Sequence, residues 1–160
     1  MSTEREPRLP DRLGDVLGPH APLGEGLTIL LLTISSDGYP HQAMLSCGEV
    51  VAVDDERLAL AVWPTSTAAR NLAERPRATL ALVDEGTSWC LFAEIADVGT
   101  VVTPLSGTLC RFDATITRVT SDRAPYAVLE SGVTFQLTDP EATTARWREL
   151  RAAIVQGGRT

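Results

Sequence analysis

The sequence feature that most constrains the fold is the alternation of apolar and polar residues between Leu109 and Val119. Successive side chains of a β-strand point to opposite faces, so this alternation predicts a strand with one buried face. The residues expected to point inward are Cys110, Phe112, Ala114 and Ile116. The residues expected to point outward are Arg111, Asp113, Thr115 and Thr117.

Five further segments have strand composition and are separated by turn-forming residues. They span residues 27–34, 41–53, 58–63, 77–84 and 89–98. The second of these is long enough to be bent or bulged around Gly48. Six such strands predict a mainly β protein that closes into a barrel.

The segment from Leu58 to Trp63 has two different faces. Leu58, Leu60 and Val62 share one face and are expected in the barrel core. Ala59 and Ala61 lie on the other face, where small residues let another layer approach closely.

Helical segments are expected at both ends of the chain. Residues 10–18 can form about two turns of helix, and Asp139 with Pro140 is typical of a helix start. The spacing of Trp147, Leu150 and Ile154 gives the second helix one apolar face, and Gly157-Gly158 marks its end. Three arginines are expected to remain in water: Arg146, Arg148 and Arg151.

A chain of 160 residues, 44% apolar and 22% charged, has the size and composition of a single domain. Within it we expect a helical arm over residues 1–24 and a barrel core over residues 25–120. A C-terminal segment over residues 121–160 contains the helix expected at 140–155.

Charge and composition exclude several classes of function. A net charge of −7 disfavours binding to nucleic acid or to an anionic membrane. All fourteen basic residues are Arg, so the chain cannot use a lysine Schiff base or a P-loop lysine. The three cysteines and two histidines lack metal-site spacing, so no metal is expected.

The sequence predicts neither a membrane-spanning segment nor a secretory signal. The longest apolar stretch has eight residues, Leu27 to Ile34, whereas about 18–20 are needed to cross a bilayer. The first six residues alternate in charge, which is unlike a signal peptide. The expected compartment is therefore the cytoplasm.

The segment from Trp63 to Arg77 has the composition of an anion-binding site. Thr65 or Ser66 can cap a helix that ends before Pro76, which places hydroxyl groups beside the free amides of its first turn. Arg70 lies one helical turn after Ser66 on the same face and could contact the same anion. The alternative is that these residues only cap a connecting helix and that Arg70 is solvated.

In order and spacing, this segment and its neighbours resemble the FMN-binding split-barrel family, the pyridoxamine 5'-phosphate oxidase-like proteins. The matching pieces lie within residues 25–120 and comprise residues 30–41, 51–58 and 66–83. The resemblance implies a six-stranded antiparallel split barrel with a short inserted helix and terminal helices. It also implies FMN as the cofactor and a homodimer that builds each flavin site from both chains.

The resemblance assigns a set of cofactor-binding residues. It places the strand after the Asp37-Gly38-Tyr39-Pro40 turn under the flavin ring, and it places the phosphate and ribityl chain along Ser66 to Asn71. The expected cofactor-binding residues are Met44, Leu45, Ser46, Trp63, Thr65, Ser66, Thr67, Arg70 and Asn71.

The chain departs from the true oxidases at three cationic positions. The family's strand Arg and its Arg-Lys pair fall here on Ala43, Thr67 and Ala68. Each charge-assisted contact contributes about 1.5–3 kcal/mol, so these losses weaken phosphate binding unless Arg70 or another group compensates. Pyridoxamine phosphate is not an expected substrate, because the acidic chain has no second basic cluster.

Three functions remain open from the sequence. The first is a flavin-dependent oxidoreductase that acts on an unidentified small molecule and has no assignable catalytic side chain. The second is a non-catalytic flavin-binding or sensing module. The third is a cofactor-free split-barrel interaction protein, which is favoured if Ala59 and Ala61 face only side chains.

Overall fold

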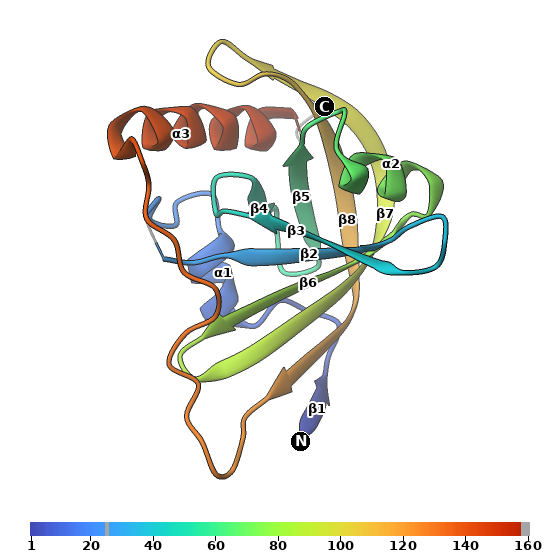
Figure 1. Ribbon diagram of the computed structural model, residues 1–160, viewed down its shortest axis with the longest axis vertical. Coiled ribbons are helices and arrows are strands. Elements are labelled where there is room, and N and C mark those ends of the chain that lie inside the picture. Colours follow the sequence, from blue (N-terminus) through green and yellow to red (C-terminus); the bar gives the residue numbers. More distant parts are fainter. Residues whose placement is uncertain (25, 158–160) are drawn as a thin grey trace.

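The computed structural model describes residues 1–24 and 26–157. These residues form one antiparallel sheet and three helices (Figure 1). The helices are α1 (Asp11–Leu17), α2 (Thr67–Glu74) and α3 (Pro140–Gly157). The strands are β1 (Ser2–Arg5), β2 (Ile29–Ile34), β3 (Pro40–Leu45), β4 (Val50–Ala52), β5 (Arg57–Val62), β6 (Arg77–Asp84), β7 (Thr87–Thr103) and β8 (Gly107–Asp122).

The sheet has the order β3-β2-β6-β7-β8-β5-β4, and β1 pairs with β8 off this path. The sheet curves around its core through the long strands β7 and β8. Strand β8 pairs with β7 along its length and with β5 over residues 110–115. The β7–β8 pairing shifts register at Phe92/Ala93 and at Ile95/Asp97. Such irregularities bend strands and let a sheet fold around a core. The mainly β, split-barrel class predicted from the sequence is confirmed.

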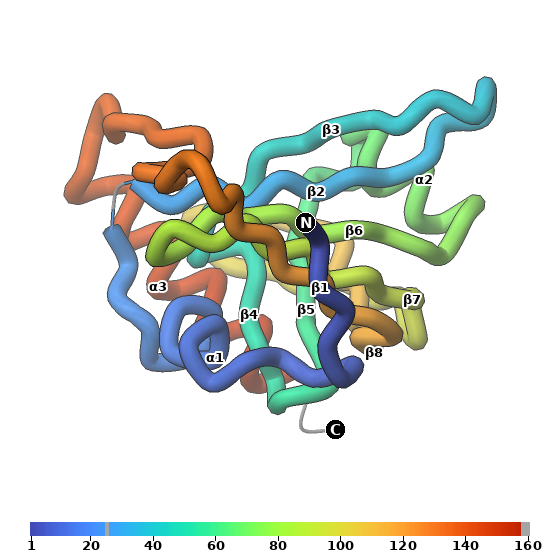
Figure 2. The backbone as a smooth tube through the Cα atoms, turned by 90° about the horizontal axis from the view of Figure 1, so that it is seen from below, coloured from blue at the N-terminus to red at the C-terminus, as the bar shows by residue number. Residues whose placement is uncertain are grey.

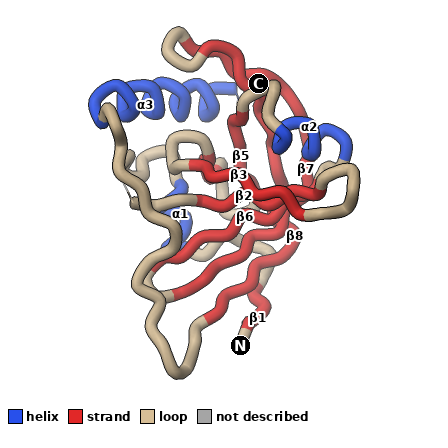
Figure 3. Tube along the Cα trace, viewed as in Figure 1, coloured by secondary structure: helices blue, strands red, loops and turns tan. Residues whose placement is uncertain are grey.

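Two apolar clusters lie on opposite faces of β5. Leu58, Leu60 and Val62 belong to the inner core, which α1 also joins through its buried leucines. Ala59 and Ala61 belong to an outer cluster with Leu150 and Ile154 of α3. The prediction that small residues admit another layer is therefore confirmed, and Figure 3 shows α3 outside the strands.

The structure has eight strands rather than six. The segment 41–53 divides into β3 and β4, because a turn over residues 46–49 interrupts it at Gly48. The other added strand is β1, which pairs with residues 119–122 of β8 (Figure 2). All four residues of β1 are exposed, so it carries no apolar pattern by which a sequence could reveal it.

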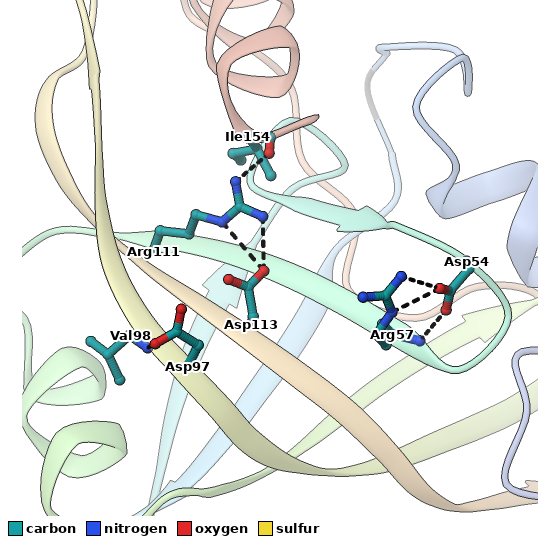
Figure 4. Close-up of polar contacts among 7 residues, drawn as sticks. All are labelled: Asp54, Arg57, Asp97, Val98, Arg111, Asp113 and Ile154. Atoms are coloured by element: carbon teal, nitrogen blue, oxygen red, sulfur yellow. Dashed lines mark hydrogen bonds and ion pairs between the residues drawn. The ribbon is translucent and has the colours of Figure 1, made fainter. Parts of the chain in front are cut away.

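Two arginines that were expected to face water are covered by other parts of the protein. Arg111 is only 4% exposed, because α3 covers that part of β8. Its guanidinium donates hydrogen bonds to the carbonyl oxygen of Ile154 and to Asp113 (Figure 4). The distance from Arg111 Nη2 to Asp113 Oδ1 is 2.8 Å. Arg151 donates to the carbonyl of Ala21 at 2.6 Å, and its partial burial lowers the pKa of its guanidinium.

The remaining predictions at the chain ends have mixed outcomes. The helix predicted at residues 140–155 is confirmed and runs as far as Gly157, with Trp147, Leu150 and Ile154 buried. Gly158 and the boundary expected at residue 25 lie outside the described residues. In the described part of the chain, every helix is too short or too polar to cross a membrane.

Candidate functional site

Helix α2 begins where the sequence predicts, directly after β5. Ser66 is its N-cap residue, with extended backbone angles, and its Oγ accepts a hydrogen bond from the amide of Ala69 at 3.1 Å. The cap satisfies one of the free amides of the first turn. The Ser66 side chain is thereby fixed at the end of β5, and α2 contacts the edge strand β3.

A hollow of about 190 Å³ lies between β3, the end of β5 and the start of α2. Met44 and Leu45 of β3 form one wall, and Trp63 and Ser66 form another. Arg146 of α3 lines it as well. Met44 is 63% exposed and Trp63 is 52% exposed, so large apolar side chains surround the opening.

The structure brings together four of the nine residues that the sequence assigned to a cofactor: Met44, Leu45, Trp63 and Ser66. Thr65 and Arg70 are exposed on α2 and its preceding turn, and Thr67 is half-buried there; none of the three lines this hollow. Ser46 is buried and lines a neighbouring hollow.

Asn71 points into the protein. It is 3% exposed, and its Nδ2 donates to Thr33 Oγ1 at 3.0 Å and to Ser35 Oγ at 3.2 Å. These two hydrogen bonds tie α2 to β2 and to the residue that follows β2. In this structure Asn71 holds the helix in place, because its side-chain nitrogen donates both hydrogen bonds to other residues of the protein.

The neighbouring hollow, of about 380 Å³, shares Met44, Leu45 and Glu49 with the first. Its far wall includes Phe135 and Trp147, whose rings meet edge to face with centroids 6.1 Å apart. The two hollows therefore lie side by side along the end of β3, and together they are called the groove beside β3.

Glu49 lies at the junction of the two hollows and is already engaged. Its Oε2 accepts hydrogen bonds from the Ser46 amide at 2.8 Å and from Ser46 Oγ at 2.9 Å. No pattern in the sequence pointed to Glu49, or to the contributions of Arg146, Phe135 and Trp147 to this groove. Only the amphipathic spacing around Trp147 indicated that α3 packs on the barrel.

A larger and more open hollow, of about 560 Å³, lies on β2, β6, β7 and β8. Its charges are already partnered, because Arg77 pairs with Glu94 at 3.4 Å and Arg118 stacks 3.8 Å from the centre of the Phe92 ring. It contains none of the residues that the sequence assigned to a cofactor. The groove beside β3 is therefore the better candidate site.

A known protein is similar to this chain in sequence. The uncharacterized protein YclD of Bacillus subtilis (strain 168) is 32% identical over 123 residues, which cover 75% of this chain and 77% of YclD. No protein-family profile matches the chain.

Two solved structures share its architecture at low sequence identity. A HupZ protein of Group A Streptococcus has a TM-score of 0.56 and 9% identity, over 71% of this chain and 99% of HupZ. An F420 reductase has a TM-score of 0.50 and 15% identity, over 61% of this chain and 91% of that protein. The chain thus belongs to the same family as YclD and has a split-barrel fold, which it shares with these two solved structures.

Proposed function

We propose that this chain binds FMN in the groove beside β3 and acts as a flavin-dependent oxidoreductase on a small molecule. The observation that carries the proposal is that Met44, Leu45 and the capped start of α2 line the same hollow. An apolar wall next to hydroxyl and amide groups is what a flat ring with a phosphate tail requires. The F420 reductase that shares this fold is, by its name, a redox enzyme.

The residues present fit a flavin in chemical type. Met44, Leu45 and Trp63 offer apolar contact for a ring, and Ser66 stands at a helix start that favours an anion. The first hollow, at about 190 Å³, is smaller than the roughly 300–1,000 Å³ usual for ligand pockets. The adjoining hollow beyond Met44 extends the space available to a larger ligand.

We also propose that a second copy of the chain completes the site. Apolar side chains stand exposed on β2, β3 and their connecting turn, where the hairpin projects from the sheet (Figure 2). They are Ile34, Tyr39 and Met44. Exposed apolar groups at an open site favour burial by a partner. Mass measurement in solution tests this, with a dimer expected at micromolar concentration and a monomer contradicting the shared site.

In this proposal the chain's own residues position the ring and exclude water from it. FMN, when bound, supplies hydride transfer at its ring. Met44 and Leu45 would cover one face of the ring, and the α2 start would hold the phosphate end. No side-chain acid or base is needed for the protein to perform this role.

A specific observation favours the cofactor-free alternative. Ala59 has no exposed surface, and its neighbours in the outer cluster are side chains of α3. Ala61 belongs to that cluster but also lines the first hollow, so this face is only partly filled by protein. A flavin-binding module without turnover remains compatible with the same groove.

The visible absorption spectrum separates these functions. The protein is incubated with excess FMN, freed of unbound flavin by gel filtration, and scanned. Retained flavin bands that bleach with a nicotinamide donor are expected for the oxidoreductase. Retained bands without reduction would favour a sensor, and a colourless protein would favour the cofactor-free interaction protein.

A further inference from the structure

We propose that Arg146 supplies the cation for the phosphate monoester of the bound flavin, from the wall opposite α2. The inference rests on the proposed FMN site and names a residue that the sequence placed in water. Arg146 lies on α3, about 80 residues from the α2 start, yet it lines the same hollow as Ser66. It would stand in for the cations missing at Ala43, Thr67 and Ala68.

Arg146 is an unengaged cation within the described residues. Among residues 1–24 and 26–157, three arginines have a guanidinium without a hydrogen bond, ion pair or ring contact: Arg70, Arg146 and Arg148. Arg70 and Arg148 are exposed, and neither lines this hollow. Arg146 is half-buried at the hollow, so it is the one of the three placed to meet a ligand there.

The other titratable groups of the hollow leave that guanidinium available. Glu49 is the one carboxylate among the described residues that line it, and its Oε2 is held by the amide and hydroxyl of Ser46. His41 also lines the hollow and adds no negative charge to it. A phosphate therefore meets one free guanidinium, one capped helix start and one carboxylate already bound elsewhere.

The backbone of Arg146 is held firmly next to this groove. The adjacent Trp147 is 4% exposed and packs over Gly48, and Leu150 one turn later is fully buried. Because these contacts fix α3, the backbone of Arg146 is held beside the groove before a ligand arrives, and binding has to order only the side chain. Charge-assisted hydrogen bonds from Arg to phosphate are among the stronger polar contacts in proteins.

The test compares two flavins that differ only in the phosphate. Wild-type protein, Arg146→Gln and Arg148→Gln are each titrated with FMN and with riboflavin, and binding is followed by flavin fluorescence. We expect Arg146→Gln to weaken FMN binding by about tenfold or more and to leave riboflavin affinity within about twofold. Arg148→Gln, on the same helix but outside the hollow, should change neither affinity.

Three results would overturn the inference. Unchanged FMN affinity in Arg146→Gln refutes the contact and leaves the FMN site standing. Equal weakening of FMN and riboflavin assigns Arg146 a structural role instead, especially if the melting temperature falls and Arg146→Lys does not restore FMN selectivity. Wild-type protein that binds neither flavin refutes the proposed function and this inference together.

Discussion

Replacing Gly48 with alanine is expected to destabilise the fold, because Trp147 occupies the space of the new methyl group. A β-carbon built at residue 48 would lie closer than 3.0 Å to Cβ, Cγ and Cδ1 of Trp147. The backbone of Gly48 does not have the positive φ that favours glycine, so the expected cost is steric. The tryptophan is also confined by the ring of Phe135.

The magnitude follows from which atoms overlap. An extra methyl group in a packed core costs about 1–3 kcal/mol, with the low values where a flexible side chain can move aside. Here the overlap includes Trp147 Cβ, which moves only with the backbone of α3. We therefore expect a loss of about 3 kcal/mol in the free energy of unfolding, from a total of about 5–15 kcal/mol for a domain.

Urea unfolding followed by far-ultraviolet circular dichroism measures this loss. The matched control is Gly99→Ala, where a β-carbon meets nothing within 4 Å and the change should stay within about 0.5 kcal/mol. In a Trp147→Ala background, itself costing about 3–5 kcal/mol, the ring atoms are gone and only Cβ remains, so adding Gly48→Ala should cost clearly less than it does in the wild type. Equal costs of Gly48→Ala in both backgrounds, or no cost in either, would refute the reasoning.

Three further predictions concern single side chains. Asn71→Ala should lower the free energy of unfolding by about 1–3 kcal/mol in urea titrations, because it removes two hydrogen bonds from a buried amide. If the variant is as stable as the wild type, α2 is held by other contacts. Partial burial raises the pKa of the Asp54 carboxyl, but hydrogen bonds from the Arg57 side chain and from nearby backbone amides outweigh this and lower the pKa below its usual 3.8. The ionised Asp54 carboxyl therefore stabilises the fold at pH 7, and this stabilisation is lost as the pH falls through the lowered pKa. Asp54→Asn should be less stable than the wild type at pH 7 and equal to it in strong acid. A stability difference that does not change with pH in thermal melts would contradict this. The double variant Ser66→Ala, Thr67→Ala should bind FMN more weakly in fluorescence titrations while remaining folded, and unchanged affinity would remove the α2 start from the site.

Local patterns were enough to predict much of the barrel. The two faces of β5 follow from alternation alone, because burial on either side of a strand repeats every second residue. The bounds of β6, Arg77–Asp84, also match the sequence prediction, since Pro76 and Glu85-Gly86 delimit it. The cap at Ser66 could be predicted because it depends on residues within one helical turn.

Features that depend on distant contacts were not predicted. Arg111 has a position typical of an outward-facing strand residue, and only the docking of α3 makes it buried. Asn71 was assigned to a ligand because its residue type and position suited one, whereas its partners Thr33 and Ser35 lie more than 30 residues away. The place of Arg146 in the groove depends on how the chain reaches α3, and the preceding residues 122–137 have no clear period.

Hydrogen exchange with and without FMN tests most directly whether the groove beside β3 is the flavin site. FMN should slow exchange in peptides that cover residues 40–49 and 62–72, which carry β3, its following turn and the α2 start. Peptides that cover Phe92 and Arg118, which line the larger hollow, should be unchanged. Protection confined to those peptides, or no protection at saturating FMN, would contradict the account.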